Sequence, residues 1–228
     1  MTDGGARKVE VLEEQRLHEG FISLDRALVR FECSDGRMSE PVERMNAERG
    51  DAVGVLLYDP RRDAVVLVEQ FRYPAYLVGE EGWLLEMVAG TLRRGCDAAA
   101  VARAEAKEEA GYCVADLHPL VTCFLTPGGS TERITLYWAT VDLDSPVGTG
   151  GGLRNEGEDT RVRIVSRAEA LRMVRDGRIR DAKTIIALLF LEGLTLGRAQ
   201  AENDMALSVS PAIGIPPVMG HPTGQHEL

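Results

Sequence analysis

The alternation of apolar and polar residues predicts a chain built largely from short strands. Gly20–Glu32 alternates as a half-buried strand does, and the Asp-Gly pair that follows it is typical of a turn. Further along, two apolar runs flank the sequence Asp-Pro-Arg-Arg-Asp, which predicts a hairpin. We therefore expect additional strands at Ala52–Tyr58, Ala64–Gln70, Trp83–Val88, Leu117–Leu125, Ile134–Val141 and Arg161–Val165.

Three segments carry helix signals. Asp97–Ala110 is rich in alanine and glutamate, begins with a capping residue and is followed by Gly111 as a stop. The capping box Ser166–Glu169 predicts a helix to about residue 176, and Asp181 is expected to cap a last helix through Leu194.

Segregated strands with few helices predict an α+β fold rather than repeated βαβ units. We expect a β-rich arm over residues 1–50, a main domain over 51–198, and a mobile tail over 199–228, which is rich in Pro and Gly and shows no periodicity. Between the last two predicted strands, Pro146–Gly157 is expected to form a glycine-rich loop with acidic residues.

Composition narrows the function. A net charge of −10 argues against general nucleic-acid binding, which needs a basic surface. The sequence has no apolar run of the roughly 18 residues that a membrane span needs and no apolar core of a signal peptide, so we expect a cytoplasmic protein. Its four cysteines form no CxxC pair, which favours reduced thiols packed as small hydrophobic residues over zinc or disulfides.

The predicted helix before Gly111 gathers three carboxylates on one face. Glu105, Glu108 and Glu109 are spaced three and four residues apart, and like charges at this spacing destabilise a helix by roughly 0.2–0.5 kcal/mol per pair. Such a face is tolerated where it is merely solvated, where cations such as Arg103 relieve it, or where a divalent metal binds. The spacing alone leaves these alternatives open.

The segment Gly90–Tyr112 resembles the Nudix box, Gly-x5-Glu-x7-Arg-Glu-U-x-Glu-Glu-x-Gly-U, where U is a bulky apolar residue. Length and register match throughout. Two positions depart from the pattern: Cys96 replaces the first glutamate of the motif, and Ala104 replaces its arginine. The resemblance implies the Nudix fold, a mixed β-sheet sandwiched by helices.

Four further phrases resemble the ADP-ribose pyrophosphatase and GDP-mannose hydrolase branch of that family. They extend the resemblance over roughly residues 20–195. The phrases are Val66–Tyr73, Leu85–Gly90, Thr126–Glu132 and Glu156–Asp159. The Gly150–Gly152 run and Ile179–Thr184 lean towards the GDP-mannose side.

The resemblance implies a metal site that holds Mg²⁺ or Mn²⁺. Its ligands would be the carboxylates of Glu105, Glu109 and Glu158 and the backbone carbonyl of Ala89. Glu108 would lie nearby in a catalytic role. The two residues missing from the box usually orient these carboxylates, and Arg103 is an imperfect substitute because it lies about 100° round the helix.

The same resemblance assigns roles to residues outside the box. Glu156 matches a proposed general base, and Arg72 matches a guanidinium that binds pyrophosphate oxygens, although a surface arginine at a strand end is the plainer interpretation. Glu132 would contact the substrate or its water network. Glu86 would lie near the metals or simply pair with an arginine. Members of this branch are homodimers joined through N-terminal β-arms, so Arg49 is expected to reach the substrate of a neighbouring subunit.

Together these features predict metal-dependent hydrolysis of the pyrophosphate bond of a nucleoside diphosphate sugar, either ADP-ribose or GDP-mannose. Two alternatives stay open. One is a catalytically weak or inactive module that binds a nucleotide sugar as a sensor, and the other is an interaction protein with no ligand.

Overall fold

The computed structural model describes residues 6–153 and 159–201, with side-chain surroundings through Thr195. Its strands are β1 Val9–His18, β2 Ser23–Phe31, β3 Val42–Glu48, β4 Asp51–Asp59, β5 Ala64–Phe71, β6 Trp83–Glu86, β7 Val88–Leu92, β8 His118–Phe124, β9 Arg133–Thr140 and β10 Arg161–Ser166. Its helices are α1 Tyr73–Leu77, α2 Ala98–Ala110, α3 Arg167–Arg175 and α4 Ala182–Ala201.

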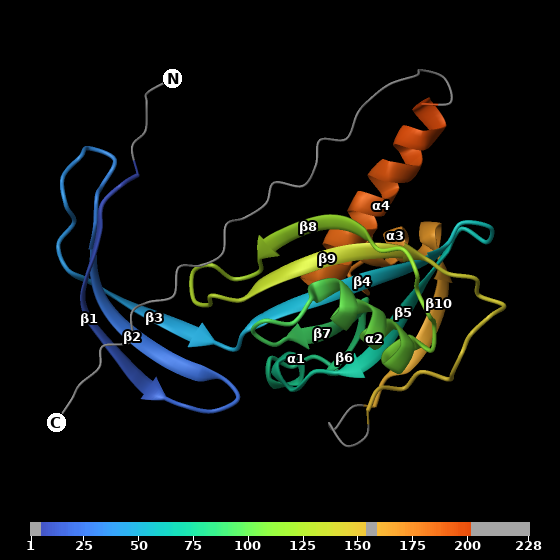
Figure 1. The fold of residues 1–228 in the computed structure, drawn as a ribbon, viewed down its shortest axis with the longest axis horizontal. Helices are drawn as coiled ribbons and strands as arrows, with labels where there is room; N and C mark the ends of the chain where they lie inside the picture. The colour runs from blue at the N-terminus through green and yellow to red at the C-terminus, as the bar shows by residue number, and fades with distance from the viewer. Residues whose placement is uncertain (1–5, 154–158, 202–228) are drawn as a thin grey trace.

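The strands form two separate sheets. β1, β2 and β3 make an antiparallel arm that stands away from the body in Figure 1. The body holds a seven-stranded sheet of order β10-β5-β4-β9-β8, with β6 paired to β5 and β7 paired to β4. β4 and β9 run parallel, whereas the other pairs are antiparallel, so the sheet is mixed.

Helices cover both faces of the body sheet (Figure 1). Successive residues of β4 point to opposite faces, as strand geometry requires. Val55 packs in one core cluster with residues of α2, and Leu56 packs in the other with residues of α3 and α4. The expected α+β sandwich with an N-terminal β-rich arm is confirmed.

Local capping signals predicted the starts of the longer helices correctly. The Asp97 carboxylate accepts hydrogen bonds from the Ala99 and Ala100 amides, and the Ser166 hydroxyl accepts one from the Glu169 amide. The Asp181 carboxylate likewise accepts from the Thr184 amide at 3.0 Å. These bonds satisfy amides that the helix itself leaves without partners.

One predicted strand is two strands. The expected strand Trp83–Val88 is interrupted at Met87, because β6 pairs with β5 whereas β7 pairs with β4. At the change of partner, the Met87 amide donates to the Thr184 hydroxyl of α4 at 2.7 Å. The hairpin strands β4 and β5 are paired over only three residues, and they separate where β6 and β7 insert.

Other expectations need correction. The last helix does not end at Leu194 but continues through Ala201, past the expected domain limit at 198; beyond it, residues 202–228 of the expected tail lie outside the described part of the chain. The short helix α1 is absent from the predictions. Cys96 and Cys113 are exposed free thiols rather than packed residues. In the described part of the chain, no helix is long and apolar enough to span a membrane.

The end of α2 depends on a glycine in a crowded position. Gly111 has a φ of +77°, in the left-handed region, and its amide donates to the Lys107 carbonyl. A Cβ atom at this residue would lie 2.3 Å from the carbonyl oxygen of Gly148. Two separate reasons therefore favour glycine at position 111: the positive φ angle and the lack of space for a Cβ atom.

We expect Gly111→Ala to destabilise the protein by about 3 kcal/mol, since it adds a backbone clash to left-handed strain. The matched control is Gly95→Ala. Gly95 has a similar φ of +83°, but a Cβ atom added there would meet nothing within 4 Å, so only the backbone cost of about 1 kcal/mol applies. Urea unfolding of both variants measures the difference, and equal destabilisation would contradict the crowding argument.

Candidate active site

The acidic face of α2 packs against β7. Glu109 is 2% exposed, and its Oε2 accepts a hydrogen bond from the Ala89 amide at 3.1 Å. The Glu105 carboxylate lies directly over Gly90, where an added Cβ would be 1.9 Å from Glu105 Oε1. The structure thus brings the two predicted metal-binding carboxylates of α2 to the Ala89–Gly90 backbone. Glu108, the predicted catalytic residue of the helix, is exposed.

Strand directions gather the other candidate residues at one end of the body sheet. Arg49 precedes β4, and Glu132 precedes its parallel neighbour β9. β5 and β7 run antiparallel to β4, so Arg72 after β5 and Gly90 in β7 lie towards the same end. β10 runs antiparallel to β5 and therefore starts there too.

Backbone hydrogen bonds attach the glycine-rich loop to the end of α2. The Gly151 amide donates to the Glu109 carbonyl at 3.0 Å, and the Gly152 amide donates to the Glu108 carbonyl at 3.2 Å. The Thr160 amide donates to the Gly151 carbonyl at 3.1 Å, which brings the two ends of the loop together. The loop therefore starts and finishes beside the acidic helix.

Two predicted residues of this loop lie outside the described part of the chain. They are Glu156, the predicted general base, and Glu158, the predicted loop ligand, both within residues 154–158. Among the described residues, no three Asp, Glu, His or Cys side chains are grouped so that they could hold a metal ion. A complete site would need the loop carboxylates in addition to Glu105 and Glu109. The oxygen donors of these residues suit Mg²⁺ or Mn²⁺.

Arg72 and Glu86 form a two-pronged ion pair. The Arg72 Nε donates to Glu86 Oε1 and its Nη2 donates to Oε2, each at 2.7 Å. Glu86 is 2% exposed, whereas 41% of the Arg72 side chain is exposed. The sequence left two interpretations of Glu86 open, proximity to the metals or pairing with an arginine. The structure shows the pairing with an arginine.

A second cation lies on the same carboxylate. The Lys183 ammonium of α4 is 9% exposed and donates to Glu86 Oε2 and, at 2.8 Å, to Asp181 Oδ1. Burial alone would raise the pKa of Glu86, but hydrogen bonds from Arg72 and the charges of Lys183 and Arg72 together lower that pKa below its ordinary value. The Glu86 carboxylate is therefore held ionised.

The pKa of Arg72 reflects what lies around its guanidinium. The hydrogen bonds to Glu86 raise this pKa most, and the negative charges of Glu86, Glu109 and Asp181 raise it further. Arg72 thus lies within electrostatic range of the buried acid of α2. The Arg72 guanidinium is therefore coupled electrostatically both to Glu86 and to Glu109 of the acidic helix.

The turn before β9 is tied to the arm. The Ser130 hydroxyl donates to the Ala47 carbonyl at 2.7 Å, and the Ala47 amide donates to the Gly129 carbonyl at 2.8 Å. Beside this junction Arg49 Nη1 lies 3.5 Å from Glu132 Oε1 of the same chain. The structure brings these two residues together, and their substrate-binding roles stay predictions.

The sequence of the chain matches a family model described as the NUDIX domain over residues 48–188. The chain belongs to the Nudix family. It is 43% identical to an ADP-ribose pyrophosphatase of Escherichia coli (strain K12) over 188 residues, which cover 82% of this chain and 90% of that protein.

Other relatives are named either ADP-ribose pyrophosphatase or GDP-mannose pyrophosphatase. An ADP-ribose pyrophosphatase of Haemophilus influenzae is 37% identical over 86% of this chain and 89% of its own. A GDP-mannose pyrophosphatase of Pectobacterium atrosepticum is 34% identical over 79% of this chain and 92% of its own. The crystal structure of an ADP compounds hydrolase, 20% identical, superposes with a TM-score of 0.66 over 87% of this chain and all of that one, which supports the fold.

The Nudix box of this chain departs at two exposed positions, Cys96 and Ala104. Arg103 does not take the place of the missing arginine. Its Nε and Nη2 donate to the Ala115 carbonyl at 3.2 and 3.1 Å, beyond the end of the helix. In this Nudix protein, the Glu109 carboxylate accepts a hydrogen bond from the Ala89 amide.

Sequence reasoning missed Lys183 and Thr184 as parts of the site. Both lie just after the Asp181 cap, within the phrase Ile179–Thr184, which the sequence marks only as a family resemblance. Lys183 meets its partner Glu86 across 97 residues of sequence. Lys183 lies two residues after the Asp181 cap, and this position gives no sign of a partner 97 residues away.

We expect Gly90→Ala to displace the Glu105 carboxylate and to weaken Mn²⁺ binding roughly 10–100-fold. The fold should tolerate the change at a cost under about 1.5 kcal/mol, because the displaced group is the end of a flexible side chain. Gly128→Ala is the matched control, since its added Cβ meets nothing within 4 Å. Titration calorimetry with Mn²⁺ measures the affinities, and an unchanged affinity in Gly90→Ala would refute the prediction.

Proposed function

We propose that this Nudix protein hydrolyses the pyrophosphate bond of a nucleoside diphosphate sugar, ADP-ribose or GDP-mannose, with the help of Mg²⁺ or Mn²⁺. The products would be AMP with ribose 5-phosphate, or GMP with mannose 1-phosphate. The observation that carries the proposal is the attachment of the acid-bearing loop to the carboxylate-bearing end of α2. The identity to pyrophosphatases over most of both chains agrees with it.

The residues of the chain divide the chemistry between them. Glu105 and Glu109, with Glu158 from the loop and the Ala89 carbonyl, would hold the divalent cation. When bound, that cation would neutralise phosphate charge and acidify a water molecule. Arg72 would orient the diphosphate through paired hydrogen bonds.

The proton of the attacking water would pass to Glu156, with Glu108 near the same face of the helix. A carboxylate beside a cation stays ionised and can accept a proton. Arg49 and Glu132, paired at the edge of the site, would contact the part of the substrate beyond the diphosphate. Glu86 would act on the substrate only through the Arg72 guanidinium that it holds.

The order of identities makes ADP-ribose the first substrate to test, ahead of GDP-mannose. A panel of nucleotide sugars assayed with Mg²⁺, Mn²⁺ or EDTA tests the proposal. We expect hydrolysis of one of the two named substrates with metal and none with EDTA. Binding without turnover would instead identify a sensor, and neither binding nor turnover would remove the proposed function.

Glu109→Gln should lower kcat on the order of 100-fold or more, equivalent to about 2.7 kcal/mol of transition-state stabilisation. A glutamine can still accept the Ala89 hydrogen bond, so the buried position keeps its partner and the fold should persist. The control is Asp116→Asn, an exposed acid shortly after α2. Retained activity in Glu109→Gln would show that this carboxylate is not a ligand.

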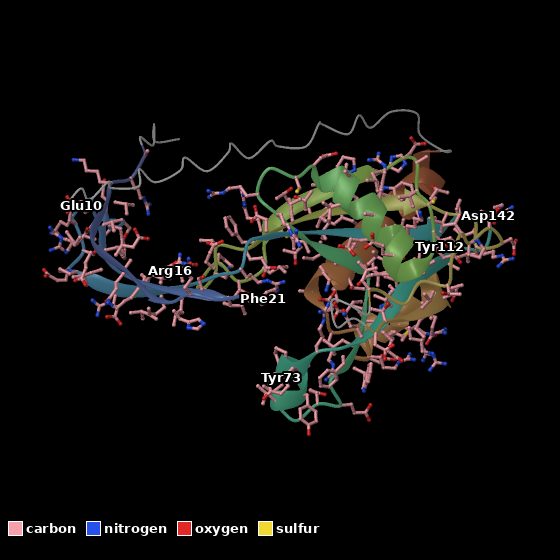
Figure 2. All side chains as sticks on the ribbon, turned by 60° about the horizontal axis from the view of Figure 1, so that its bottom comes forward. Glu10, Arg16, Phe21, Tyr73, Tyr112 and Asp142 are labelled. Carbon is pink, nitrogen blue, oxygen red and sulfur yellow. The ribbon has the colours of Figure 1, made fainter. Side chains whose placement is uncertain are left out.

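We also propose a homodimer joined through the N-terminal arm. β1 is exposed along its whole length, and the exposed apolar side chains of the arm include Val11 at 54% and Phe21 at 83%. Figure 2 shows Phe21 at the end of the arm nearer the body and Glu10 at its far end, both outside the body domain. Exposed apolar groups of this kind mark interaction surfaces.

The double substitution Val11→Asp/Phe21→Asp is expected to give a monomer, whereas the unaltered protein should show about twice the chain mass of 24.9 kDa. Surface changes of this kind alter protomer stability by only about 0.5 kcal/mol. Light scattering after gel filtration gives the masses, with Glu14→Gln in β1 as control. A monomeric unaltered protein at micromolar concentration would overturn the dimer.

A further inference from the structure

The arm joins the body of the chain at a small junction. Residues Asn46–Glu48 of β3 lie against residues Gly129–Thr131 of the turn before β9, and Figure 1 shows this turn beside the end of β3. The covalent connection from β3 to β4 consists of Arg49 and Gly50, and Gly50 has a φ of +84°. The orientation of the arm relative to the body therefore depends on this short connection and on the hydrogen bonds of the junction.

Ser130 connects the arm directly to Glu132. Its hydroxyl donates a hydrogen bond to the Ala47 carbonyl of β3 at 2.7 Å and accepts one from the Glu132 amide at 3.1 Å. A serine hydroxyl has a single proton, so donation to Ala47 leaves its lone pairs for the amide. The two bonds together fix the backbone of Glu132 relative to the backbone of the arm.

Further hydrogen bonds hold the residue between them. The Thr131 amide donates to Asn46 Oδ1 at 3.1 Å, and the Thr131 hydroxyl donates to the Glu48 carboxylate. Asn46 Nδ2 in turn donates to Asp25 of β2 at 3.4 Å. Side chains of the arm thus hold the turn on both sides of the Ala47 backbone.

The tip of the turn has little packing of its own. Residues 126–128 are exposed, and a Cβ atom added to Gly128 or Gly129 would meet nothing within 4 Å. The amides of Gly129 and Ser130 donate to the Thr126 carbonyl, which closes the turn on itself without attaching it to the body. The hydrogen bonds to the arm therefore hold this turn in place, rather than packing of its glycines.

Both members of the Arg49–Glu132 pair belong to the junction. Arg49 is one of the two connecting residues, and its Nη1 lies 3.5 Å from Glu132 Oε1. On the far side of Glu132, the Arg133 amide donates to Asp51 Oδ1 of β4 at 3.0 Å. Glu132 thus lies between one point fixed to the body sheet and another fixed to the arm. Loss of the second point would let its position shift.

We infer that Ser130 is a positioning residue, which sets the geometry of the Arg49–Glu132 pair by joining the Glu132 amide to the arm. The inference rests on the proposed function in one respect, that this pair contacts the substrate beyond the diphosphate. Ser130 acts through Glu132 and does not touch the substrate. The arm thereby serves substrate binding within its own chain, in addition to its proposed role in the dimer.

Ser130→Ala removes both hydrogen bonds of the hydroxyl. We expect this variant to raise KM about fivefold while kcat changes less than about twofold, the pattern of lost uniform binding. Ser130→Thr keeps the hydroxyl and should restore KM to within about twofold. Ser39→Ala is the matched control, because the Ser39 hydroxyl accepts from the Phe31 amide within the arm, and it should leave KM unchanged.

The decisive comparison adds Glu132→Gln. If Ser130 acts through Glu132, Ser130→Ala should change KM less than about twofold in the Glu132→Gln background, a clear non-additivity. A serine that contacted the substrate directly would cost about fivefold in both backgrounds. That result, or an unchanged KM in Ser130→Ala alone, would overturn the inference.

Binding measurements separate the inference from a general disturbance of the site. In calorimetry with EDTA, the affinity of Ser130→Ala for ADP-ribose or GDP-mannose should fall about fivefold. Its affinity for inorganic pyrophosphate should not change, because pyrophosphate lacks the part that the Arg49–Glu132 pair contacts. An equal loss for pyrophosphate would show a general disturbance and would overturn the inference.

A second variant keeps the test informative if Ser130→Ala fails to fold. Asn46→Ala removes the acceptor of the Thr131 amide and loosens the same turn from the arm, so it should shift the affinities in the same direction. If the unaltered protein hydrolyses neither nucleotide sugar but binding follows this order of variants, the proposed function fails and the inference stands. A protein that binds neither nucleotide sugar would remove both.

Discussion

The hydrogen bonds between the end of α2 and the glycine-rich loop are the constraint on which the candidate site depends. The last carbonyls of a helix have no partner within the helix and must find one elsewhere. In α2, those of Glu108 and Glu109 accept from the Gly152 and Gly151 amides. The backbone carbonyls of the two acidic residues therefore hold the loop. The same hydrogen bonds cap the helix and position the loop.

This constraint explains the crowding of glycines at the junction. A Cβ on Gly111 would meet the Gly148 carbonyl, and a Cβ on Gly150 would lie 2.3 Å from the Glu109 carbonyl. Side chains at these positions would push the loop away from the helix. Glycine here serves close approach of two backbones rather than flexibility. Elsewhere in the candidate site, the ion pair between Glu86 and Lys183 joins β6 to α4.

Much of the fold could be predicted from signals local in sequence. The features that could not be predicted depend on contacts between distant parts of the chain. The caps at Asp97, Ser166 and Asp181 depend on residues two or three positions away, and the sequence displays them directly. The break of the predicted strand at Met87 depends instead on a hydroxyl of α4, 97 residues along the chain. β1 shows no alternation because all of its residues are exposed, so periodicity could not place it.

The candidate site follows the same division. The spacing of Glu105 and Glu109 is enough to predict their common face, since helical geometry is local. The Arg72–Glu86 pair was one of two open interpretations, and only the pairing of β5 with β6 decides it. Lys183 was out of reach, because nothing in its neighbourhood in sequence indicates that its charge is needed by a buried acid elsewhere.

The departures at Cys96 and Ala104 can be judged by the contacts that remain. Side-chain ion pairs are one way to orient a metal-binding carboxylate, and backbone donors and close packing are another. Here the Ala89 amide donates to Glu109, and the bare backbone of Gly90 leaves just enough room for the Glu105 carboxylate. Both constraints come from β7, which the pairing with β4 holds in place. A backbone donor in a paired strand has little freedom to move, so β7 restricts the Glu105 and Glu109 carboxylates independently of the residues at positions 96 and 104.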